Sequence, residues 1–61
     1  MRLKLEMALD NEAFSGNATE ICRILLKLAD TIDRGGEMQI GEEWNLRDIN
    51  GNKVGKAKIC K

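Results

Sequence analysis

The sequence predicts a small α+β domain, with one helix packed on a three-stranded, mainly antiparallel sheet in the order βαββ. Three observations support this fold class: apolar and charged residues alternate over residues 1–9, an apolar stripe recurs at helical spacing over residues 18–34, and Asn50-Gly51 is a strong hairpin signal. The 61 residues are expected to form a single domain, 1–61. A chain this short is near the lower limit for folding without disulfides, a metal or a partner.

The first predicted strand has one apolar side and one charged side. The apolar side carries Leu3, Leu5, Met7 and Leu9, and the charged side carries Arg2, Lys4 and Glu6. Such a period of two is typical of a half-buried strand. Residues 10–16 are expected to form a loop.

The predicted helix has recognisable end signals. Asn17, followed three residues later by Glu20, resembles a capping box and places the helix start near Ala18. At the other end, Gly35-Gly36 is expected to supply a left-handed cap.

The apolar arc of this helix spans about 200° when projected at 100° per residue. One small sheet does not cover so wide an arc, so either the core edge is thick or part of the helix meets a second subunit. The second interpretation predicts a homodimer, whose candidate contact is either the Cys22 and Leu26 side of the helix or the Ile24 side.

The last third of the sequence predicts a hairpin. Asn50-Gly51 favours a two-residue type I′ turn, in which both residues have positive φ. This turn would set Trp44 opposite Ala57 and Arg47 opposite Val54. Trp44, Leu46, Ala57 and Ile59 would then share a face, which we expect to lie under the helix together with Leu3, Leu5 and Met7. Residues 37–43 are expected to form either a short edge strand or an arm.

The stretch DINGNKVG, residues 48–55, fits neither a metal loop nor a phosphate cradle. Counted from Asp48, the sixth position of a calcium loop would be Lys53 and the twelfth Ile59, and neither residue suits its role. The glycine spacing and the following helix of a P-loop are also missing. The sequence therefore favours a plain turn.

Composition argues against catalysis and metal binding. The chain contains no histidine, which removes the commonest general base, and Cys22 and Cys60 alone cannot complete a zinc site. We expect a protein that is not an enzyme, with no cofactor, no metal and reduced thiols.

Charge is unevenly distributed although the net charge is zero. Residues 10–43 hold eight acidic and three basic side chains, whereas residues 44–61 hold five basic and one acidic. In the predicted register the exposed sheet face carries Arg2, Lys4, Arg47, Lys56 and Lys58. This face is the candidate partner-binding surface, either for an acidic protein or for nucleic acid, and the alternative is a lysine-rich face that only maintains solubility.

No stretch has the length and hydropathy of a membrane span, and residues 1–9 lack the apolar core of a signal peptide. We therefore expect a cytoplasmic protein with no membrane partner.

Taken together, the alternating first strand, the helix EICRILLKLADTID closed by glycine and the hairpin LRDINGNKVG resemble small, mostly uncharacterised phage and prophage accessory proteins. The resemblance covers residues 3–59. It implies a viral origin and the cytoplasm of a bacterial host. Proteins of this class often bind and disable a host protein, including defence systems, by occupying a surface.

These observations predict a small phage-type binding protein that docks on a host macromolecule, with inhibition of host defence as one form of activity. The alternative is a nucleic-acid-binding or transcription-modulating module that uses the basic sheet face. A structural accessory of the virion is a third hypothesis.

Overall fold

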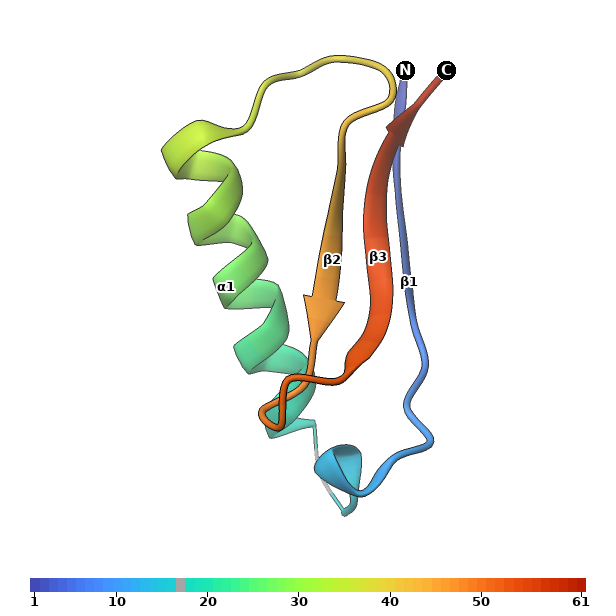
Figure 1. The fold of residues 1–61 in the computed structure, drawn as a ribbon, viewed down its shortest axis with the longest axis vertical. Helices are drawn as coiled ribbons and strands as arrows, with labels where there is room; N and C mark the ends of the chain where they lie inside the picture. Colours follow the sequence, from blue (N-terminus) through green and yellow to red (C-terminus); the bar gives the residue numbers. More distant parts are fainter. Residues whose placement is uncertain (17) are drawn as a thin grey trace.

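The computed structural model describes residues 1–16 and 18–61 of the chain, and it has the predicted α+β architecture (Figure 1). One helix and three strands follow in the order βαββ. The elements are β1 (Arg2–Met7), a short 3-10 helix η1 (Glu12–Phe14), α1 (Thr19–Gly35), β2 (Glu43–Arg47) and β3 (Lys53–Cys60). The fold class expected from the sequence is confirmed.

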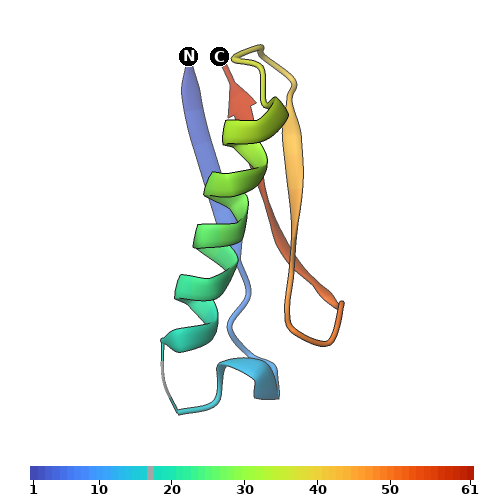
Figure 2. The same ribbon diagram turned by 90° about the vertical axis from the view of Figure 1, so that its left-hand side faces the viewer.

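The three strands form one antiparallel sheet in the order β1-β3-β2 (Figures 1 and 2). The last strand, β3, therefore lies in the centre. β1 pairs with it in a regular antiparallel register, in which Leu3 lies opposite Ile59 and Leu5 opposite Ala57. This arrangement leaves β1 and β2 as the two edges. The sequence predicted β2 and β3 as neighbours in a hairpin, but it did not specify which of these two strands β1 would join.

The core lies between α1 and the sheet. Its buried apolar residues are Phe14, Ile24, Leu28, Leu46, Val54, Ala57 and Ile59. Trp44 is partly buried against this cluster. The predicted inward side of the hairpin, with Leu46 and Ala57 facing the helix, is therefore correct.

The hairpin register is correct along most of its length. Trp44 lies opposite Ala57 and Leu46 opposite Gly55, as expected. An irregularity after Leu46 then sets Arg47 opposite Lys53, so the prediction that Arg47 faces Val54 is wrong.

The turn itself differs from the predicted two-residue type I′ form. Gly51 has a φ of 84°, but Asn50 does not have the positive φ that type I′ requires. The carbonyl of Asp48 accepts a hydrogen bond from the N–H of Gly51, and the N–H of Asp48 donates to the carbonyl of Asn52. This pattern is typical of a three-residue loop, a type I turn followed by a glycine bulge. The extra loop residue explains the shifted register at Arg47.

The end of α1 does not use the predicted left-handed glycine cap. Gly35 is still helical, and Gly36 continues in an extended conformation with a φ of −72°. Its N–H donates to the carbonyl of Ile32 at 2.8 Å. A Cβ at Gly36 would lie 2.8 Å from that same oxygen, so close approach is the reason for glycine here. The predicted capping box at the other end depends on Asn17, which lies outside the described residues.

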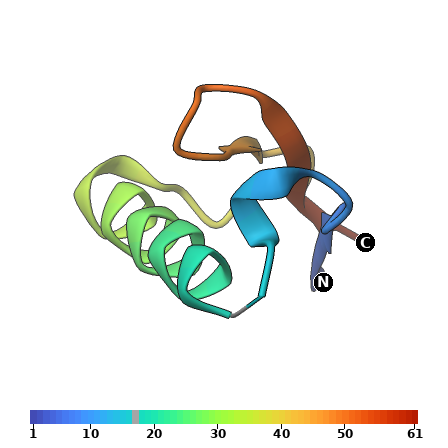
Figure 3. The same cartoon turned by 90° about the horizontal axis from the view of Figure 1, so that it is seen from below.

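The helix covers the β2 side of the sheet and leaves β1 largely uncovered (Figure 3). Figures 1 and 3 both place α1 nearest to β2 and farthest from β1. Leu3 and Leu5 face the helix side, as predicted, but 58% and 40% of their surfaces stay exposed. The expectation that these side chains lie beneath the helix is therefore wrong, and only Met7 of this strand packs against the core.

The connection between α1 and β2 is irregular rather than a strand. Gly41 donates to the carbonyl of Ile59, and Ile59 donates to the carbonyl of Glu42, so the connection joins β3 just before β2 begins. Met38 and Ile40 in this connection are 79% and 61% exposed.

Candidate partner-binding surface

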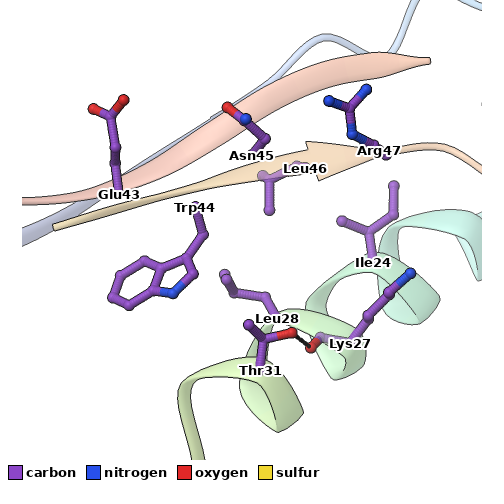
Figure 4. Close-up of a pocket in the computed structure, with 9 residues that line it drawn as sticks. All are labelled: Ile24, Lys27, Leu28, Thr31, Glu43, Trp44, Asn45, Leu46 and Arg47. Carbon is purple, nitrogen blue, oxygen red and sulfur yellow. Dashed lines mark hydrogen bonds between the residues drawn. The ribbon is translucent and has the colours of Figure 1, made fainter. Parts of the chain in front are cut away.

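The side of the sheet opposite α1 carries the basic residues singled out from the sequence. Arg2, Lys4, Arg47, Lys56 and Lys58 are all exposed. Figure 4 shows Arg47 pointing away from the helix, together with Glu43 and Asn45 of the same strand, whereas Trp44 and Leu46 point toward it. Strand alternation places the other four basic side chains on this outer side too. We call these five residues, with Glu6 and Glu43, the basic sheet face.

The sheet register aligns the charges of this face in rows. One row runs from Lys4 through Lys58 to Glu43, and the next contains Glu6 and Lys56. Lys4 and Lys58 lie directly opposite each other, an arrangement that is destabilising for like charges. With five basic and two acidic side chains, the face has a net charge of +3.

Two of the basic side chains have partners within the protein. The Nζ of Lys56 lies 3.7 Å from a carboxylate oxygen of Glu43, and both side chains are about half exposed. Arg47 donates to the carbonyl of Gly51 at 3.1 Å. An exposed pair of this kind contributes little to stability, so Lys56 can exchange Glu43 for an external acid at low cost.

The sequence interpretation placed Glu6 on the charged side of the first strand, but it left both Glu6 and Glu43 out of the candidate surface. Glu6 and Glu43 share strand parity with the basic residues, so the alternation itself contains the signal. They interrupt the basic surface at two points.

A separate hollow of about 310 Å³ lies between α1 and β2 (Figure 4). Its floor is formed by Ile24, Leu28 and Leu46, and the hydroxyl of Thr31 at its rim donates to the carbonyl of Lys27 at 2.9 Å. No carboxylate or thiol points into this floor among the side chains drawn there. The hollow offers apolar contact rather than reactive groups.

Asp48, only 5% exposed, organises the hairpin loop. One carboxylate oxygen accepts hydrogen bonds from the N–H groups of Asn50 and Asn52, and the other accepts from the side-chain amides of Asn52 and Asn11. Burial acts to raise the pKa of Asp48, but these donors outweigh it and hold the pKa below its ordinary value. Asp48 is therefore a charged anchor that ties the loop to the segment preceding η1. An Asp two residues before an Asn-Gly pair is typical of a turn closed by its own side chain, and this was the available signal.

Glu20 joins the helix to the same loop. Its carboxylate accepts from Arg23 at 2.6 Å and from the backbone N–H of Ile49 at 2.7 Å. The hydrogen bond from Arg23 is the main reason that the pKa of Glu20 lies below its ordinary value, while burial opposes the shift. Arg23 also donates to the carbonyl of Arg47, so both partners of this ion pair hold the hairpin against α1.

Of the two candidate dimer sides of the helix, only the Cys22 and Leu26 side is exposed. Ile24 is 2% exposed and belongs to the core, so it is not available to a second subunit. The sequence stripe did not distinguish the helix side that meets β2 from the outer flank. Leu26 is 72% exposed, and Cys22 is an exposed free thiol; Cys60 is also free and partly buried.

Across the described parts of the chain, 1–16 and 18–61, no three cysteine or acidic side chains gather in a metal-binding group. In that same portion, no helix is both long and apolar enough to traverse a bilayer.

The fold and this surface define a small two-layer α+β domain with one charged sheet face. No protein-family model, curated protein or solved structure matches the chain.

Proposed function

We propose that this protein is a small, non-enzymatic binding protein that docks its basic sheet face on an acidic surface of another protein. The observation that carries the proposal is the composition of that face: five exposed basic side chains lie on one side of the sheet with only two acidic ones. Electrostatic complementarity of this kind steers association and selects partners.

An acidic protein suits the face better than nucleic acid does. Proteins that bind single strands without sequence preference combine a basic groove with aromatic side chains on which bases stack. The only aromatic residues of the sequence are Phe14 and Trp44. Phe14 is buried in the core and Trp44 points toward the helix, so neither is offered to a base on this face.

The two buried carboxylates are poorly suited to act as a general base. Asp48 and Glu20 accept several hydrogen bonds each, and both have a lowered pKa. A general base works best with a pKa near the operating pH. These two groups are instead held charged for a structural purpose.

The resemblance to phage and prophage accessory proteins suggests the source of the partner. We propose that the partner is a bacterial host protein, and that docking of the small protein blocks its surface. A component of a host defence system is the specific partner that we propose. The competing hypothesis is that the protein modulates transcription by binding nucleic acid. The experiments below distinguish a protein partner from a nucleic-acid partner.

A charge-reversal pair tests the proposal. The variant Lys56→Glu with Lys58→Glu changes the central strand of the basic sheet face, and Lys27→Glu with Arg34→Glu makes the same net change on α1. Wild-type protein and the helix variant should capture the same protein from bacterial lysate, and the sheet variant should not. Capture that is equal for both variants would refute a role for this face.

A second arm uses labelled DNA and RNA oligonucleotides and fluorescence anisotropy. If all five basic side chains contacted phosphates of duplex DNA, the logarithm of affinity would fall with a slope of about −4.5, roughly 500-fold for a fourfold rise in salt. We expect no binding at low salt. Steep, salt-sensitive binding that the sheet variant loses would replace the protein partner with nucleic acid.

A further inference from the structure

The outer edge of β1 exposes backbone groups that are free to pair. The N–H of Ala8 donates to the carbonyl of Val54, so these two residues form a hydrogen-bonded pair. In an antiparallel ladder, hydrogen-bonded pairs alternate with pairs that are not hydrogen bonded to each other. Leu3, Leu5 and Met7 therefore direct their N–H and C=O groups away from β3. The opposite strand agrees, because Ile59, which faces Leu3, exchanges its hydrogen bonds with Gly41 and Glu42 on the β2 side.

The same strand also exposes apolar side chains on the side that faces the helix layer. Leu3 is 58% and Leu5 40% exposed, although their partners Ile59 and Ala57 are buried. Figure 2 shows β1 at one margin of the sheet, with β2 at the other. An apolar hollow of about 270 Å³ adjoins it. The hollow is lined in part by Met1, Leu3, Ile32, Met38, Trp44 and Ile59.

The helix contributes to this uncovered area. Leu25 lies seven residues before Ile32, which lines the hollow, so both lie on the β1-facing flank of α1. Leu25 is 41% exposed. An exposed edge strand with apolar side chains is a surface that proteins normally cover or protect.

The charge pattern of β1 indicates what covers it. Lys4 and Glu6 lie one residue before and one residue after Leu5. The outer face of β1 is therefore complementary in charge to an antiparallel copy of itself. When two antiparallel copies meet with Leu5 opposite Leu5, Lys4 lies opposite Glu6 of the partner subunit, and this contact occurs twice. Leu3 then lies opposite the partner subunit's Met7, on the apolar side.

We propose that a second copy of this chain pairs antiparallel with the β1 edge, with Leu5 on the twofold axis, to form a continuous six-stranded sheet. Each odd-numbered residue of β1 then exchanges its outward backbone groups with an odd-numbered residue of the partner, as an antiparallel ladder requires. The carboxylate of the partner's Glu6 also stands beside Lys4, which within one chain faces only Lys58. A shift of the partner by two residues would instead set the two Lys4 side chains opposite each other, which is unfavourable.

This dimer joins two basic sheet faces on one side and two helices on the other. It differs from a dimer made through the exposed helix flank at Cys22 and Leu26, and it does not depend on the proposed function. The two interfaces make opposite predictions for surface substitutions on β1 and α1.

A charge swap provides the test, with mass measured by sedimentation equilibrium from micromolar to millimolar concentration. The wild-type chain should reach twice its mass of 6.8 kDa. Lys4→Glu alone sets two carboxylates opposite each other at both contacts, and Glu6→Lys alone sets two ammonium groups opposite each other there. Each single variant should weaken dimerisation by at least about tenfold, since like charges directly opposite each other are destabilising.

Restoration makes the test specific. The double variant Lys4→Glu with Glu6→Lys should regain the wild-type dimer, and a mixture of the two single variants should form a heterodimer. Leu26→Lys is the matched control on α1 and should leave the dimer intact. A monomeric wild type, failure of restoration with native circular dichroism, or loss of the dimer in Leu26→Lys would overturn the proposal.

Discussion

Two helix positions that look alike in the sequence should differ sharply in their effect on stability. Ile24→Ala and Leu26→Ala each remove three carbon atoms from the apolar arc of α1, but Ile24 is 2% exposed and Leu26 is 72% exposed. Loss of three buried carbons costs about 2.4 kcal/mol at about 0.8 kcal/mol each, and the cavity left behind raises this to about 2.5–4 kcal/mol. A chain of this length has a total stability of about 3–9 kcal/mol. Ile24→Ala should therefore leave the protein close to unfolding.

Urea unfolding followed by tryptophan fluorescence measures this difference, because Trp44 reports on the core. With a slope of about 1 kcal/mol per molar urea, the midpoint of Ile24→Ala should fall by roughly 2.5–4 M. Leu26→Ala should change the free energy of unfolding by no more than about 0.5 kcal/mol. Measuring both variants at two protein concentrations separates the stability of one chain from any gain by association. Equal losses for the two variants would refute the assignment of Ile24 to the core and Leu26 to the surface.

Two further predictions concern the sheet and the hairpin loop. A Cβ at Gly55 would overlap a backbone carbonyl of β1, whereas nothing lies within 4 Å of the corresponding position at Gly35. Gly55→Ala should therefore lower the thermal midpoint of unfolding strongly, while Gly35→Ala should raise the free energy of unfolding by about 0.5–1 kcal/mol. A Gly55→Ala variant with an unchanged thermal midpoint would show that β1 does not approach β3 as described. The lowered pKa of Asp48 means that its contribution to stability is complete at neutral pH, declines as the pH nears about 3.9, and is lost as the pH falls through the lower pKa of the folded state. The gap in urea midpoint between the wild type and Asp48→Asn should thus narrow between about pH 6 and about pH 2, and a constant gap would contradict this role.

Local patterns predicted the elements better than their arrangement. Alternation identified β1, and the helical stripe identified α1, because both signals depend on neighbouring residues in the chain. The predicted pairing of Trp44 with Ala57 is also correct, although the loop is one residue longer than predicted, because the irregularity between Leu46 and Arg47 offsets the extra loop residue. The loop type was wrong because Asp48 accepts hydrogen bonds from the N–H groups of Asn50 and Asn52 and stabilises a longer turn.

The candidate surface was predictable in part for the same reason. Strand parity correctly grouped the basic residues of β1 and β3 on the outer face and placed Glu6 beside Arg2 and Lys4. Applied to the second strand, the same parity would have added Glu43. The link from Glu20 to the N–H of Ile49 was not predictable, because these residues are far apart in the chain and the contact exists only when α1 packs on the hairpin.

Local patterning was enough to establish that this chain forms one helix and three strands, and that basic side chains gather on one side of the strands, because periods of about 3.6 and about 2 are properties of neighbouring residues. Which apolar surfaces are covered depends instead on how distant segments pack. With β3 in the centre and α1 displaced toward β2, Ile24 is buried while Leu3 and Leu5 remain exposed on a free edge. Which of these side chains are buried depends on where the helix sits over the sheet. No periodic pattern in the sequence encodes that position.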